Sequence, residues 1–175
     1  MEYTALQSAG QMLEHVRRFA LELKEASGEM RPRDAERLVQ QAAWLERRLA
    51  AAAQLPGDAP GQTMTDALAD AAVEAWRLER VLDKAIARMS LLRAQPLLNA
   101  ARWCFAQMDA LLSSAGIEIV DLAGQAYSPG LPVKALNAGE CGGESLRIAQ
   151  TVEPVIMADG GVWRMGSVML EEENP

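Results

Sequence analysis

Residues 116–137, GIEIVDLAGQAYSPGLPVKALN, mark a change of periodicity in the chain. Before this stretch, apolar residues recur every three or four positions, which is the spacing of amphipathic helices. After Gly116, apolar and polar residues alternate in short runs that Gly and Pro separate, as in β-strands. The sequence therefore predicts an α+β protein with two domains, a bundle of about four long helices over residues 1–115 and a small β domain over 116–175.

Four helical segments are predicted in the N-terminal domain. Thr4 and Gln7 have the spacing of a capping box for the first segment, and Gly28 is expected to end it in a left-handed conformation. Pro32, whose fixed φ suits a first helical turn, is expected to open the second segment. A linker with two Pro and two Gly follows at about residues 54–62.

The third segment, from Met64 to Leu92, has the strongest pattern, a heptad seam over four repeats. Its many Ala residues bury little apolar area, so the seam needs several neighbours. These are either helices of the same chain, in an antiparallel bundle, or a second copy. For a homodimer, the predicted interface residues are Leu68, Ala71, Ala75, Leu78, Leu82, Ala85 and Met89. Pro96 is expected to end this segment or to open the fourth helix, which runs to Gly116.

Composition excludes several classes of function. The net charge of −7 argues against nucleic-acid binding, which needs clustered Lys and Arg. No apolar run reaches the length of a membrane span, and the N-terminal residues lack the pattern of a secretion signal. Two cysteines in unlike surroundings, Cys104 in a helical pattern and Cys141 in a Gly-rich loop, suggest no disulfide framework. We expect a cytoplasmic protein that does not bind membranes.

No pattern in the sequence points to catalysis. Cys141 would need a nearby histidine to act as a nucleophile, and the only one, His15, lies on the first helical segment. A single histidine also makes a zinc site improbable. The Gly-rich run at 139–144 contains acidic residues that would repel a phosphate. We therefore expect no catalytic residues, no metal and no cofactor. Trp44, Trp76 and Trp103 are expected in the bundle core or at helix interfaces.

The β domain is expected to hold five or six short strands. Its clearest element is a hairpin in which Asp159, Gly160 and Gly161 form a tight turn between two long apolar runs. The prolines at 129, 132 and 154 are expected at strand ends or sheet edges, because Pro cannot donate a ladder hydrogen bond. Strict alternation places Val162 and Trp163 on opposite faces of one strand, so one of the two is expected to be buried.

From about residue 111 onward the sequence resembles the C-terminal domain of the GrpE family, the nucleotide exchange factors of DnaK-type chaperones. The resemblance lies in the runs Gly116-Ile117-Glu118 and Tyr127-Ser128-Pro129, in Gly124, and in the closing run RMGSVML. In the closing run, the matching residues are Arg164, Gly166, Val168 and Leu170. The chain departs from the family at Ser128, where the family has Asp. It also departs at GLPV, where the family has His-Glu-Ala, and at Met165-Gly166, where it has Pro-Ala.

The resemblance implies a dimeric co-chaperone that is not an enzyme and that binds the ATPase domain of a DnaK-type chaperone. It implies partner contacts at Tyr127, Pro129, Leu131, Arg164 and Gly166. Local chemistry leaves alternatives: Tyr127 packing under its loop, Pro129 fixing a turn and Arg164 pairing with a nearby Glu. Because the His-Glu-Ala passage is missing, an oligomeric adaptor that presents the β domain to another assembly is the second hypothesis.

Overall fold

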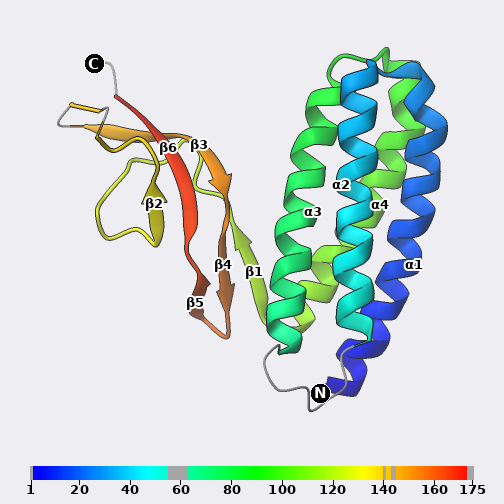
Figure 1. Ribbon diagram of the computed structural model, residues 1–175, viewed down its shortest axis with the longest axis horizontal. Coiled ribbons are helices and arrows are strands. Elements are labelled where there is room, and N and C mark those ends of the chain that lie inside the picture. The colour runs from blue at the N-terminus through cyan, green and yellow to red at the C-terminus, as the bar shows by residue number, and fades with distance from the viewer. Residues whose placement is uncertain (1, 55–62, 140, 143–144, 173–175) are drawn as a thin grey trace. The chain divides into compact units, whose positions relative to one another are not determined.

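The computed structural model describes residues 2–54, 63–139, 141–142 and 145–172 (Figure 1). The chain divides into two compact units, Met1–Ala115 and Gly116–Pro175. Among the described residues, helices occupy the first unit and six strands occupy the second, so the predicted α+β class is confirmed.

The described part of the first unit has four α-helices, α1 (Glu2–Ala26), α2 (Pro32–Ala53), α3 (Met64–Ile86) and α4 (Leu91–Ser114), and a short 3₁₀ helix, η1 (Ser27–Glu29), follows α1. They lie side by side in a bundle (Figure 1) in which α1 packs against α2 and α4, and α3 packs against the same two helices. Short connections from α1 to α2 and from α3 to α4 make the two helices of each pair antiparallel.

The helix ends follow the predictions in part. Pro32 occupies the first turn of α2, and Gly116, at φ +69°, takes the left-handed conformation just after α4. Thr4 does not start a helix, because α1 already begins at Glu2. Gly28 lies in η1 and does not adopt a positive φ, so its predicted role was wrong.

The third segment is shorter than predicted. It ends at Ile86, and α4 begins at Leu91, so that Pro96 lies inside α4. The helix tolerates this proline near its start at the loss of one backbone hydrogen bond. Instead of the box predicted at Thr4, a capping box forms at Thr63, whose hydroxyl accepts a hydrogen bond from the Asp66 N–H at 3.1 Å. The predicted linker lies, apart from Gln54, outside the described residues.

The heptad seam of α3 is buried within the single chain. Met89 alone among its predicted interface residues is half-buried. The other six are 3% exposed or less: Leu68, Ala71, Ala75, Leu78, Leu82 and Ala85. The intramolecular bundle, one of the two interpretations that fit the sequence, accounts for this burial. An interface between two copies through these side chains would require the bundle to open.

The strands described in the second unit form two three-stranded sheets. In the first, β1 (Ile117–Val120) and β5 (Gly161–Arg164) flank β4 (Val155–Ala158), and all pairs are antiparallel. In the second, β6 (Gly166–Glu172) lies between β2 (Val133–Ala135), its parallel neighbour, and β3 (Leu146–Glu153), its antiparallel neighbour.

The predicted hairpin is present, but each of its two long runs is divided between the sheets. Asp159 and Gly160, at φ +51° and +76°, form the tight turn between β4 and β5. Pro154 separates β3 from β4, and Met165 separates β5 from β6. The prolines at 129, 132 and 154 all lie outside the strands, as predicted.

A compact apolar core holds the β unit together. Its buried members come from β2, β3, β4 and β6 and from the segment after β1, and they are Leu122, Val133, Ile148, Val155, Val168 and Leu170. Thr151 is also buried, and its hydroxyl donates a 2.6 Å hydrogen bond to the Asp121 carboxylate, which satisfies the polar group.

Candidate partner-binding surface

The loop from β1 to β2 carries three of the predicted contact residues. Tyr127 and Leu131 are half-buried and pack against the core of the β unit. The Tyr127 N–H donates a 2.8 Å hydrogen bond to the Leu146 carbonyl, which fixes the loop against β3. Pro129 is exposed at the outside of the loop. Packing under the loop, one of the alternatives considered for Tyr127, therefore accounts for its position.

The closing run contributes the other two predicted contact residues, which occupy different surroundings. Arg164 is half-buried on β5, opposite Ile156 of β4. Gly166 is buried, and a Cβ atom there would lie 2.8 Å from the Glu153 carbonyl oxygen. This close approach of two backbone segments leaves no room for a side chain, so packing accounts for the glycine at position 166. Its predicted partner contact stays a prediction.

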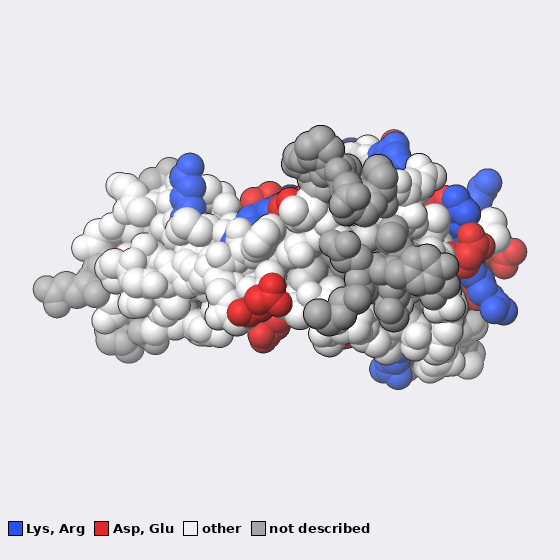
Figure 2. All heavy atoms as spheres, turned by 90° about the horizontal axis from the view of Figure 1, so that it is seen from below, with Lys and Arg blue, Asp and Glu red and all other residues white. Residues whose placement is uncertain are grey.

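The strongest feature of the β unit was not predicted. Val162, Trp163 and Met165, close together in sequence at β5, have exposed fractions of 49%, 45% and 58%. The expectation that Val162 or Trp163 would be buried was therefore wrong. On the face seen in Figure 2 the β unit presents mostly uncharged side chains. Two exposed apolar residues of β5 and the residue that follows the strand define what we call the hairpin patch, Val162, Trp163 and Met165.

A β-bulge explains why alternation failed here. Ile156 pairs with Arg164 and Met157 pairs with Val162, so one residue of β4 advances while two residues of β5 advance. Trp163 is the extra residue, and a bulge of this kind re-aims side chains. Because β5 is also an edge strand of its sheet, no strand in the described part of the chain pairs with its outer side.

A second apolar area lies on the outer face of the other sheet. Val168 and Leu170 of β6 point into the core, whereas Met169 between them is half-exposed. Leu136 follows β2, and its N–H donates to the Val168 carbonyl, which places Leu136 beside Met169 across the ladder. Leu136 is exposed. The β unit thus offers apolar contact area on both sheets.

Asn137 closes the second sheet with its side chain. The amide accepts a 2.8 Å hydrogen bond from the Leu170 N–H and donates a 2.9 Å bond to the Leu170 carbonyl. It therefore takes the place of a paired strand residue. Cys141 lies 3.8 Å from the same carbonyl oxygen and is half-buried, and much of the Gly-rich run around it lies outside the described residues.

The two cysteines and His15 have different surroundings in the fold. Both are free, and burial raises the pKa of the Cys104 thiol to about 12, so that thiol stays protonated at neutral pH. His15 packs edge-on against Trp103, with ring centroids 4.3 Å apart. Within the described ranges, no three His, Cys, Asp or Glu side chains form a group that could hold a metal ion.

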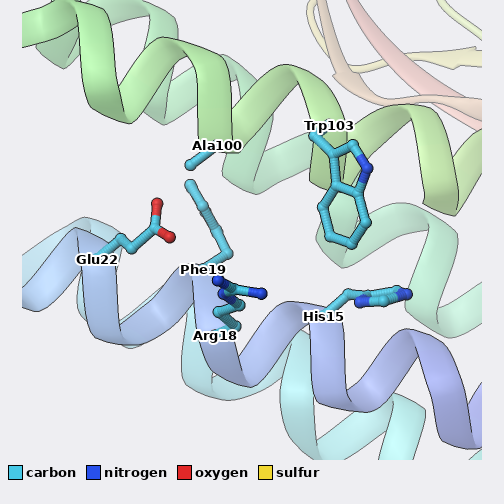
Figure 3. A pocket seen from close by; sticks show the side chains of 6 residues that line it. All are labelled: His15, Arg18, Phe19, Glu22, Ala100 and Trp103. Atoms are coloured by element: carbon cyan, nitrogen blue, oxygen red, sulfur yellow. The ribbon is translucent and has the colours of Figure 1, made fainter.

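The helical unit has a surface groove of about 220 Å³ between α1 and α4 (Figure 3). Its walls combine aromatic, small and charged side chains, and they are His15, Arg18, Phe19, Glu22, Ala100 and Trp103. Trp103 is 46% exposed. Trp76 is buried, as expected for a helix interface, whereas Trp44 on α2 is partly exposed.

Comparisons with protein families, curated proteins and solved structures find no match to this chain. A scan of the sequence against known protein families finds no match, and neither a curated protein nor a solved structure matches the chain. The resemblance to the GrpE family therefore stays a prediction from the motifs. No helix among the described residues has the length and apolar character needed to cross a membrane.

Proposed function

We propose that the chain is a GrpE-like co-chaperone whose β unit binds the ATPase domain of a DnaK-type chaperone and promotes nucleotide release. One observation carries the proposal: the hairpin patch groups three exposed apolar side chains within four positions of the chain, on a unit that has a compact apolar core of its own. Grouped exposed apolar residues are typical of binding surfaces, and Trp is enriched among residues that dominate binding energy.

The motif resemblance supports the same assignment. The Gly-Ile-Glu run begins β1, and the closing run forms the end of β5 and most of β6 and includes Met165 of the hairpin patch. The chain also combines a helical bundle with a small β unit, which is the architecture that the resemblance implies.

Nucleotide exchange requires no bond-making residue. A binding protein accelerates release when it has higher affinity for the open state of the ATPase domain than for the closed state. Moving that equilibrium from 1:99 to 99:1 requires about 10⁴-fold preference for the open state. A rigid apolar patch suits such discrimination, because it loses contact area when the partner surface changes shape.

Stopped-flow release of a fluorescent nucleotide from the chaperone of the same cell tests the proposal. We expect saturating protein to accelerate release at least tenfold, and Trp163→Ala to remove most of the effect. Trp44→Ala is the matched control, because Trp44 is a comparably exposed tryptophan on α2. Wild-type protein that leaves the release rate unchanged would refute the exchange function. Equal losses in the two variants would refute the role of the hairpin patch.

The adaptor alternative is favoured by one observation. In the stretch GLPV, where the GrpE family has His-Glu-Ala, Leu131 packs against the core and Val133 is buried in β2. This passage therefore stabilises the fold of the β unit. A pull-down from the native cell extract separates the two functions. ATP-sensitive recovery of a DnaK-type chaperone supports exchange, and ATP-independent recovery of a different assembly through Trp163 supports the adaptor.

A further inference from the structure

The groove between α1 and α4 has an apolar floor and an aromatic wall. Phe19 and Ala100 lie between Glu22 at one end and Trp103 at the other (Figure 3). Phe19 is 2% exposed, so its ring forms the bottom of the groove. Trp103 is 46% exposed, and His15 supports it in an edge-on contact with ring centroids 4.3 Å apart. The groove therefore offers apolar atoms a surface that is already formed before any ligand arrives.

Two side chains of opposite charge line the groove on the α1 side. Arg18 and Glu22 lie one helical turn apart, which puts their Cβ atoms about 5–6 Å from each other. Among the described residues, neither side chain has an ion-pair or hydrogen-bond partner. The nearby Glu14 differs, because its carboxylate lies 2.8 Å from the Arg17 guanidinium. A cation four positions before an anion is the less favourable order for a helical ion pair, so Arg18 and Glu22 remain available to a ligand.

We propose that this groove binds a free α-amino acid with an apolar side chain of moderate size. The ammonium group of the ligand pairs with the Glu22 carboxylate, and the carboxylate of the ligand pairs with the Arg18 guanidinium, which suits two parallel hydrogen bonds. The apolar side chain of the ligand packs on Phe19 and against Trp103. Only two bonds separate the charged groups of an α-amino acid, so one molecule reaches both side chains of a pair one helical turn apart.

The two charges distinguish this ligand from other small molecules. A simple amine or a simple carboxylate would pair with one of the two side chains and leave the other without a partner. A peptide has its ammonium and its carboxylate at opposite ends, so it cannot present both groups to Arg18 and Glu22 together. A free amino acid carries no net charge, and the two groove charges also sum to zero.

The volume of the groove fits a ligand of this size. It is about 220 Å³, the space of roughly seven waters at about 30 Å³ each. Sites for drug-sized molecules and cofactors are larger, at about 300–1,000 Å³. The proposed site lies on the helical unit and contains no residue of the hairpin patch, so it does not rest on the proposed exchange function.

Isothermal titration calorimetry of the full chain with L-leucine tests the proposal. We expect a Kd on the order of 0.1 mM, as suits a ligand of this size in an open groove. Glycine, which lacks the apolar side chain, is expected to bind at least tenfold more weakly. Isocaproate is leucine without its ammonium group, and isoamylamine is leucine without its carboxylate. Each is expected to bind at least tenfold more weakly than L-leucine, because each leaves one groove charge without a partner.

Substitutions in the groove test which side chains hold the ligand. Glu22→Gln and Arg18→Gln are each expected to weaken L-leucine binding about tenfold, because each removes one charge. Glu25→Gln is the matched control, because Glu25 is exposed on the same helix and does not line the groove. Trp103→Ala is expected to weaken binding about tenfold, and its control is Trp44→Ala on α2. Circular dichroism confirms that the variants fold.

Three outcomes would count against the site. A wild type that shows no binding of L-leucine at millimolar concentration would overturn the proposal as a whole. Equal affinities of Glu22→Gln and Glu25→Gln for L-leucine would show that the Glu22 carboxylate does not hold the ammonium group. Isocaproate or isoamylamine bound as tightly as L-leucine would contradict recognition of both charges. None of these measurements involves a chaperone or a nucleotide, so their failure would leave the proposed exchange function untouched.

Discussion

The two units differ in how regularly their buried positions recur. In α2 the buried residues Leu38, Ala42, Leu45 and Leu49 follow at steps of three and four without interruption. In β3 the buried residues are Ile148 and Thr151, three apart, and none of β5 is buried. A helix keeps its phase because its hydrogen bonds are local, whereas the phase of a strand depends on its neighbours. Bulges in β3 and β5 shift that phase.

The same difference determines where apolar surface is exposed. In the bundle, the exposed residues Leu92, Trp103 and Ala110 lie along one side of α4, because the helix repeats its geometry along its whole length. In the β unit, the exposed residue Trp163 is at a bulge, and Val152 stands at another. Exposed apolar residues in the two units therefore have opposite causes. In the bundle they follow the regular period of a helix, and in the β unit they occur where a bulge interrupts the alternation of a strand.

The largest loss of stability is expected from a change in the core of the helical bundle, the unit with regular burial. Leu78 is fully buried in α3, and Leu78→Ala is expected to lower the free energy of unfolding by about 2–5 kcal/mol through the cavity that it leaves. Leu92→Ala, at an exposed position, is the control and is expected to change stability by about 0.5 kcal/mol or less. Urea unfolding followed by far-UV circular dichroism measures both. Similar losses in the two variants would contradict the burial pattern of the bundle.

The next largest loss of stability is expected at Gly166, where the start of β6 passes close to the backbone between β3 and β4. Gly166→Ala places a Cβ atom 2.8 Å from the Glu153 carbonyl oxygen and 3.1 Å from the Val155 backbone nitrogen. We expect the variant to lose about 1–3 kcal/mol, the usual cost of overpacking. Gly130→Ala is the matched control, because a Cβ atom there has open space. Differential scanning calorimetry should show a lower melting temperature for Gly166→Ala alone, and equal melting temperatures would refute the close crossing.

A smaller loss of stability is expected when the capping box at the start of α3 is removed. Thr63→Ala removes the hydroxyl that accepts the Asp66 N–H and is expected to cost about 1 kcal/mol. Ser90 occupies the equivalent position before α4 but makes no capping hydrogen bond with its side chain, so Ser90→Ala is expected to cost less. Urea midpoints of the two variants test this ranking, and the reverse order would contradict the capping box.

The smallest effect depends on pH. Burial of its carboxyl, together with Asp83 and Asp109 nearby, raises the pKa of Glu79 above its usual value. Because the folded pKa exceeds the unfolded one, the ionised carboxyl lowers stability at neutral pH, and this loss disappears as pH falls through the folded pKa. The side chain also reaches solvent, so the effect is small.

Glu79→Gln should therefore melt slightly above the wild type at pH 7, and the difference should vanish at acid pH. Glu36→Gln on the exposed face of α2 is the control. Thermal melts of the three proteins at neutral and acid pH measure the effect. A difference that grows as the pH falls would contradict the sign.

More of the fold than of the candidate site could be predicted from the sequence. The switch at Gly116, the start of α2 at Pro32 and the turn at Asp159-Gly160 follow from residues whose backbone preferences act locally. The exposure of Trp163 does not follow from local backbone preferences, because it depends on a bulge between two strands. The role of Gly166 likewise depends on the backbone of Glu153, thirteen positions earlier.

The sequence by itself determined that helices precede strands and which helix faces turn inward, since hydrogen bonds within each segment and the 3.6-residue period fix both. Only the tertiary structure decided that the seam of α3 is filled by helices of the same chain. It also decided which apolar residues of the β unit lie outside, because strand register and bulges are set by partners distant in sequence.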